Sequence, residues 1–149
     1  MSRATRLQGV ARFKQAQERK AAEQLGAANQ GLAEQQQTLK VLNEHRSMYR
    51  TLLSDSHRSG TYATTWRQNL NFLGALDNAI DSQHANVALH QQNTQQARTH
   101  WSESHRKQQA VANLRSRLSQ EEQLQHLSQE NQQATENWVA RQGGRANDE

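Results

Sequence analysis

The chain has 149 residues, of which only 33% are hydrophobic and 5% aromatic, and its mean hydropathy of -1.11 excludes an ordinary globular core. The absence of proline argues against disorder and favours long helices, and the absence of cysteine excludes disulfides and thiolate metal sites. The net charge is +4 and no window approaches the apolar run of a membrane span, so we expect a cytoplasmic-type soluble chain without direct membrane insertion.

The first predicted element is a long helix over about residues 3 to 57. From Leu25 onward its apolar residues follow a seven-residue register with two core positions. So narrow a stripe favours a coiled-coil seam over a helix that covers a globular core. The first core position holds Leu25, Leu32 and Leu39, and the second holds Ala28, Gln35, Leu42 and Tyr49. Towards the N-terminus the seam thins to Ala21, Phe13, Val10 and Leu7.

A turn is predicted at about residues 58 to 61. Residues 54 to 61 are rich in serine, aspartate and threonine, whose side chains compete with helical backbone hydrogen bonds. Gly60 can adopt the positive φ that ends many helices. We therefore expect the chain to reverse near Gly60.

The second predicted helix spans about residues 62 to 140, followed by a flexible tail over 141 to 149. One core position of its register holds Trp66, Leu73, Ile80, Val87, Thr94 and Trp101, and Leu70, Leu76 and Ala97 lie near the other. Folding the helices antiparallel about Gly60 sets apolar residues opposite one another wherever the two residue numbers sum to about 120. The predicted fold is all-α, a single antiparallel coiled-coil hairpin over residues 1 to 149.

In this arrangement the second helix extends past the first and carries apolar residues that nothing in the chain would cover. These residues are Leu118, Leu124, Leu127 and Trp138. A bare apolar stripe on a soluble protein usually marks a partner site.

Positive charge gathers at the same end of the hairpin. Residues 1 to 20 carry six basic residues and one acidic residue, and the charged residues within 106 to 117 are all basic. A solvated helical face, nucleic acid and an acidic protein partner are the alternatives. The sequence lacks a groove-reading motif and interleaved aromatic residues, so we expect a protein partner and no nucleic acid.

The coiled-coil register does not explain Phe72. This residue forms a stripe at helical spacing with Leu76 and Ala79, and Leu42 and Tyr49 lie seven residues apart on the opposite helix. Two interpretations remain open. A broad seam buries all five residues, or they form an exposed apolar patch just below the turn.

No catalytic motif occurs in the sequence: there is no glycine-rich phosphate loop, HExxH motif, nucleophile-elbow serine or cysteine nucleophile. None of the seven histidines forms an i, i+4 pair with another, so structural or solvent-facing roles are expected for them. We expect no enzymatic activity, no cofactor and no metal.

The run from Leu39 to Ile80, followed by a helix with Trp101 and the segment QQAVANLRSRL, resembles the FliJ family of flagellar export proteins. The resemblance implies a two-helix coiled coil similar to the central stalk of rotary ATPases, and a non-enzymatic role in type III protein export during flagellum biogenesis. It also implies a location at the cytoplasmic face of the inner membrane. The residues that carry it are Tyr49, Arg50, Leu53, Gly60, Trp66, Phe72, Leu76, Ala79, Ile80 and Trp101.

Three partner classes are implied by the resemblance: the hexameric export ATPase FliI, the export gate protein FlhA, and export chaperones. Related stalks serve virulence type III secretion systems, and a generic coiled-coil adaptor or nucleic-acid binder is the alternative from another class. The expected ATPase contacts, at the end with both termini, are Arg3, Arg6, Leu7, Val10, Phe13, Leu118, Leu124, Leu127 and Trp138. The residues that match the family's gate-binding patch are Leu42, Tyr49, Phe72, Leu76 and Ala79. Thr38 and His45 depart from that patch, so we expect His45 to alter the strength or pH dependence of the contact.

Overall fold

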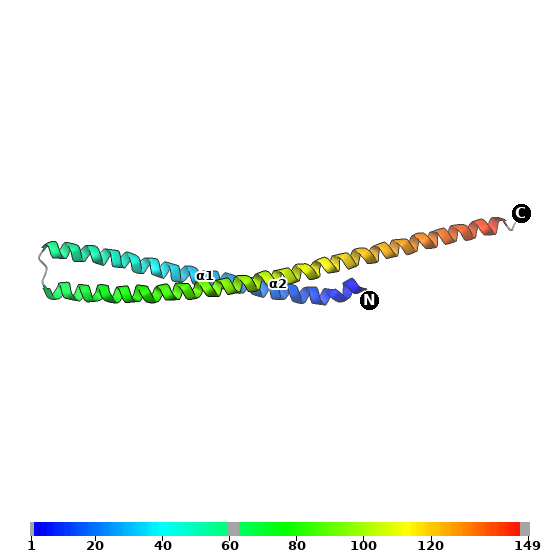
Figure 1. The fold of residues 1–149 in the computed structure, drawn as a ribbon. Coiled ribbons are helices and arrows are strands. Elements are labelled where there is room, and N and C mark those ends of the chain that lie inside the picture. Colours follow the sequence, from blue (N-terminus) through cyan, green and yellow to red (C-terminus); the bar gives the residue numbers. More distant parts are fainter. Residues whose placement is uncertain (1, 60–62, 147–149) are drawn as a thin grey trace. The chain divides into compact units, whose positions relative to one another are not determined.

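The computed structural model describes residues 2–59 and 63–146, which form two long α-helices (Figure 1). Helix α1 spans Arg3–Ser59 and helix α2 spans Ala63–Ala146. The described residues contain no strand, and the two helices pack against each other in antiparallel directions. This arrangement confirms the predicted fold class. The expected turn at Gly60 lies outside the described residues.

The C-terminal end of α2 differs from the prediction. The helix continues to Ala146, whereas the glycines and charged residues of this segment predicted an end near residue 140 and a flexible tail from 141. Neither Gly143 nor Gly144 adopts a positive φ, so neither ends the helix in the way that a C-terminal glycine often does. The prediction ended the helix where the apolar pattern ends after Trp138, whereas the helix continues over residues 141–146 without large apolar residues.

The chain divides into two compact units, each with a segment of both helices. We call Lys20–Ser102 the distal unit, and Met1–Arg19 with Glu103–Glu149 the terminal unit.

The seam of the distal unit is mostly apolar and follows alternating three- and four-residue spacing on both helices. The predicted register holds for Leu25, Leu32 and Leu39, which are half-buried, and for Ile80 and Val87, which are buried. The buried side chains of this unit are Ala21, Leu53, Leu76, Ile80, Gln83, Val87 and Thr94.

Two buried polar side chains tie the helices of the distal unit together. Gln83 Nε2 donates hydrogen bonds to the backbone oxygen of Gln35 at 2.9 Å and to its Oε1 at 2.8 Å. Thr94 Oγ1 donates to the backbone oxygen of Ala28 at 3.2 Å. The residue numbers of these pairs sum to 118 and 122, close to the predicted 120. Because polar groups inside a coiled coil need matching partners, these bonds favour this register over shifted ones.

Several residues predicted to line the seam lie outside it. Leu70 is 44% exposed because the half-buried Asn69 occupies the companion position, and Trp66 is also exposed. In α1, Val10 and Phe13 are exposed because Leu7, Ala11 and Lys14 occupy the covered positions.

The seam of the terminal unit is short of large apolar residues. Its half-buried α1 residues are Ala4, Leu7, Gln8, Ala11, Lys14 and Glu18, and those of α2 include Ser104, His105, Gln108, Val111 and Leu118. It ends where the backbone nitrogen of Arg3 donates to Glu122 Oε1 at 2.8 Å. We call residues 123–146 of α2 the overhang, because all of them are exposed.

Candidate partner-binding surfaces

An exposed apolar surface lies along one side of the distal seam. Phe72 of α2 packs against Tyr49 of α1 with ring centroids 4.6 Å apart and an interplanar angle of 49°. Tyr49 is half-buried, while Phe72 remains 46% exposed. Ala79, seven residues after Phe72, is exposed as well. These side chains form the edge of the seam, where a partner can still reach them.

The five residues predicted as a patch do not share one environment. Leu76 is 9% exposed and belongs to the seam, and Leu42 is half-buried in it. Phe72 and Ala79 are exposed. Neither open interpretation therefore holds for all five: the seam includes Leu76, because it occupies a core heptad position, and leaves Phe72 outside.

Three further apolar residues on α1 widen this surface, and the sequence pattern did not identify them as a patch. Val41, Met48 and Leu52 are all exposed. Their separations of seven and four residues place them on one strip of α1, on the side of the seam that carries Phe72 in the antiparallel register. Val41 and Met48 are seven residues apart, and this heptad spacing is the sequence signal that could have identified the strip. We call the following residues the distal patch: Val41, Met48, Tyr49, Leu52, Phe72 and Ala79.

Charge is concentrated on the other side of the distal seam. Arg46 and Asp77 form an ion pair at 3.6 Å across the two helices, and Lys40 and Arg50 are exposed on α1. The distal unit therefore has an apolar side and a charged side.

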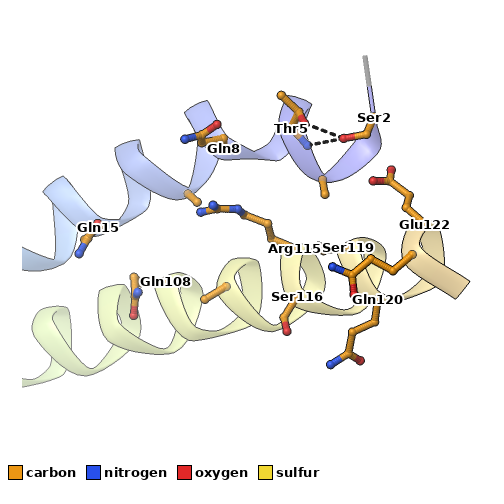
Figure 2. A pocket seen from close by; sticks show the side chains of 14 residues that line it. Ser2, Thr5, Gln8, Gln15, Gln108, Arg115, Ser116, Ser119, Gln120 and Glu122 are labelled. Carbon is orange, nitrogen blue, oxygen red and sulfur yellow. Dashed lines mark hydrogen bonds between the residues drawn. The ribbon is translucent and has the colours of Figure 1, made fainter. Parts of the chain in front are cut away.

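The terminal unit contains a polar groove of about 620 Å³ between α1 and α2 (Figure 2). Small residues such as Ala4, Ala11 and Ala112 leave the space open, and Arg115 extends from α2 toward α1. Ser2 and Thr5 are hydrogen-bonded to each other at its outer end. Its polar lining residues are Ser2, Thr5, Gln8, Gln15, Gln108, Arg115, Ser116, Ser119, Gln120, Glu122 and Gln123.

The basic segments of α1 and α2 come together in the terminal unit. All their arginines are exposed, whereas Lys14 is half-buried in the seam and Glu18 lies 3.7 Å from His105. The exposed basic residues, which we call the basic collar, are Arg3, Arg6, Arg12, Arg19, Arg106, Lys107, Arg115 and Arg117. Such a surface attracts acidic partners.

The overhang exposes large apolar side chains. Leu124 is 66% exposed, Trp138 is 62% exposed, and Leu127 and Val139 are more than half exposed. Leu118 was expected among the bare residues, but it is half-buried because α1 extends far enough along α2 to cover it. Leu7 is half-buried in the same seam, and Arg3, Arg6, Val10 and Phe13 are exposed near it in the sequence.

Within residues 2–59 and 63–146, no group of three or more acidic, histidine or cysteine side chains could hold a metal ion. Neither of the two described helices has an apolar stretch long enough to cross a membrane.

Comparison with known protein families gives a match over nearly the whole chain. A family model described as "Flagellar FliJ protein" matches residues 2–147. Comparisons with curated proteins and with solved structures give no match.

Proposed function

This chain belongs to the flagellar FliJ protein family, and we propose that it acts as a non-enzymatic stalk that couples the export ATPase FliI to the export gate protein FlhA. The family membership supports a role in flagellar type III protein export. The proposal adds which surface serves which partner.

The observation that carries the proposal is the presence of two different surfaces in two different units. The distal patch is apolar and borders an apolar seam. The terminal unit combines the basic collar with an uncovered helix. Two chemically distinct surfaces suit a protein that contacts two partners at once.

We assign the ATPase ring to the terminal unit. Exposed arginines accelerate association with an acidic surface. Apolar residues such as Leu124, Leu127 and Trp138 then stabilise the complex, because contact removes them from water. Leu118 and Leu7 support this unit from within its seam rather than at its surface.

Ending the chain after Gln123 tests this assignment, because it removes all but the first residue of the overhang and keeps the seam that ends at Glu122. We expect stimulation of FliI oligomerisation and ATP hydrolysis to be lost while the shortened protein keeps its helical circular dichroism. Added salt should weaken the contact of the full chain, because exposed charges are screened. Undiminished stimulation by the shortened protein would reject the overhang as a ring contact. Offering the ATPase of a virulence secretion system in parallel tests the related alternative.

We assign the export gate to the distal patch. Phe72→Ala should abolish most FlhA binding, because a half-exposed aromatic at the centre of an apolar patch is a typical interface anchor. Leu89→Ala is the matched control, since Leu89 is 54% exposed in the same unit and lies outside the patch.

Both variants should keep nearly the melting temperature of the natural chain, so a loss of binding by Phe72→Ala alone would report the surface and not the fold. Equal FlhA binding by both variants would remove Phe72 from the gate contact. Leu76→Ala is unsuitable for this test, because Leu76 is buried and its loss destabilises the seam.

A further inference from the structure

The overhang presents three of its four large apolar residues, Leu124, Leu127 and Trp138, on the face opposite to the one that α1 covers. Continuing the seam of α2 beyond Glu122 at the same spacing leads to the polar residues Gln125, Gln129, Gln132 and Glu136 before it reaches Val139. The apolar residues instead lie two positions further on, beginning at Leu124 and Leu127. Two residues correspond to a rotation of about 200° around a helix, which is nearly the opposite face.

These apolar residues have a coiled-coil register of their own. Together with the polar Asn131 they follow alternating three- and four-residue spacing over two heptads, and we call this set the overhang stripe: Leu124, Leu127, Asn131, Ala134 and Trp138. The described part of the chain covers none of them. The spacing is that of a seam, so the occupant it fits is another helix.

We propose that this occupant is the overhang of a second copy of the chain, paired antiparallel to form a two-fold symmetric dimer. Within one chain, α1 and α2 already show how antiparallel layers align, with Ala28 beside Thr94. Applying the same layering to two overhangs pairs residues whose numbers sum to about 265. Trp138 then lies opposite Leu127 of the second copy, and Asn131 lies opposite its Ala134. The two-fold axis repeats each pair, and the outermost layers set Leu124 against Arg141, whose aliphatic stem can cover the leucine while its guanidinium stays in water.

Charge favours the antiparallel direction over the parallel one. Glu121 precedes the overhang stripe and Arg145 follows it, and the antiparallel pairing sets Glu121 of one copy at the height of Arg145 of the other. An antiparallel pair brings the acidic end of each copy to the basic end of the other. A parallel pair would place Arg141 beside Arg141 of the second copy, where the two positive charges repel each other. It would also place both Trp138 side chains in one layer, where two large rings crowd each other.

Such a dimer leaves the terminal seam intact. The overhang stripe faces away from α1, so pairing requires no break of the contact between Arg3 and Glu122. Two heptads bury less than the roughly 800 Å² per partner of a stable complex, so the dimer is concentration-dependent and reversible. This inference does not rest on the proposed function, although a ring that binds the same side chains would compete with the dimer.

Sedimentation velocity of the full chain over a series of concentrations tests the pairing. The natural chain should shift toward the dimer as its concentration rises, and Leu127→Glu should weaken the association at least about tenfold, because it puts two carboxylates into the apolar layers. Val139→Ala is the control, since Val139 is 56% exposed but lies off the overhang stripe. A natural chain that stays monomeric, or a Leu127→Glu variant that associates like the natural chain, overturns the proposal.

Thiol crosslinking tests the direction, and the chain is suited to it because it has no cysteine. Ser128 and Thr135 flank the overhang stripe, and antiparallel pairing sets Ser128 of one copy beside Thr135 of the other. A mixture of Ser128→Cys and Thr135→Cys chains should therefore give a crosslinked dimer of the two different chains with a short thiol crosslinker. Products from Ser128→Cys alone, or none from the mixture, would contradict the antiparallel dimer. Neither experiment contains the ATPase, so their failure leaves the stalk proposal standing.

Discussion

The distal and terminal units use the same two helices and the same heptad spacing, yet their seams differ in chemistry. The distal seam contains leucine, isoleucine and valine, with Leu76, Ile80 and Val87 buried. The terminal seam places Lys14, Glu18 and Ser104 at equivalent positions, and none of the described residues of that unit is buried. Apolar burial contributes about 25 cal/mol per Å², whereas half-buried charged groups contribute little. The comparison shows that a continuous register can join a strongly held region to a weakly held one.

That difference matches the surfaces of the two units. A stable distal seam can hold Phe72 and Tyr49 at its edge in one arrangement. A weak terminal seam leaves both a polar groove and an overhang for partners. The distal unit thus offers a surface on a firmly packed seam, whereas the terminal unit offers weakly held segments, as expected where a segment must adapt to its partner.

The largest predicted effect is on the stability of the distal seam. Ile80→Ala should lower the free energy of unfolding by about 3 kcal/mol, because Ile80 is 2% exposed and its removal leaves a cavity. Val111→Ala in the terminal seam should cost about 1 kcal/mol or less, since Val111 is only half-buried. Urea denaturation followed by circular dichroism measures both. Similar losses for the two variants would contradict the contrast between the seams.

A second prediction concerns substitutions that stabilise the distal seam but make its register less specific. Gln35→Leu combined with Gln83→Leu should raise the free energy of unfolding by about 1 to 2 kcal/mol, because an apolar pair replaces a hydrogen-bonded polar pair. Gln83→Leu alone should gain less, since it leaves the amide of Gln35 without this partner. Thermal unfolding measures the gain, and a double variant less stable than either single one would show that the hydrogen bonds themselves hold the seam.

A third prediction compares one glycine in each unit. Gly9 and Gly26 lie inside α1 with no atom near an added Cβ, so alanine at either position should add about 1 kcal/mol of helix stability. Gly9→Ala should slow hydrogen exchange mainly in residues 4–18, whereas Gly26→Ala should slow it in the distal unit. An equal response of both regions to Gly9→Ala would mean that the units unfold together. Gly31→Ala is a useful contrast, because its Cβ would lie 3.3 Å from His90 Nδ1 and the gain should shrink.

The smallest predicted effect concerns the first turn of the terminal unit. Ser2 Oγ accepts a hydrogen bond from the backbone nitrogen of Thr5 at 3.0 Å, so Ser2→Ala should cost about 0.5 to 1 kcal/mol locally. Exchange of the Thr5 amide should accelerate while the distal unit is unaffected. Ser2→Asn should restore protection, because asparagine caps equally well. Unchanged exchange in Ser2→Ala would leave the bond from Arg3 to Glu122 as the contact that holds this end.

Much of the fold could be predicted from the sequence by itself. The absence of proline, the sparse apolar content and the seven-residue register together determine two long helices, and the pairing near 120 follows from matching their apolar residues. The register is readable because a coiled-coil seam depends on local spacing alone. The candidate residues of the terminal unit were mostly identified in the same way, since Leu124, Leu127 and Trp138 have nothing to pair with.

Only the tertiary structure decided which residues next to the seam are exposed. Leu76 and Phe72 belong to the same predicted stripe, yet one is buried and the other reaches solvent. Positions that flank a two-helix seam are half-covered, and their exposure depends on the side chain that the other helix places beside them. Leu118 shows the same dependence, because its cover comes from the start of α1, more than a hundred residues away in the sequence. The opposed faces of the overhang likewise became visible only once the end of the seam at Glu122 was known, since sequence spacing describes a helix face but not where a second helix stops covering it.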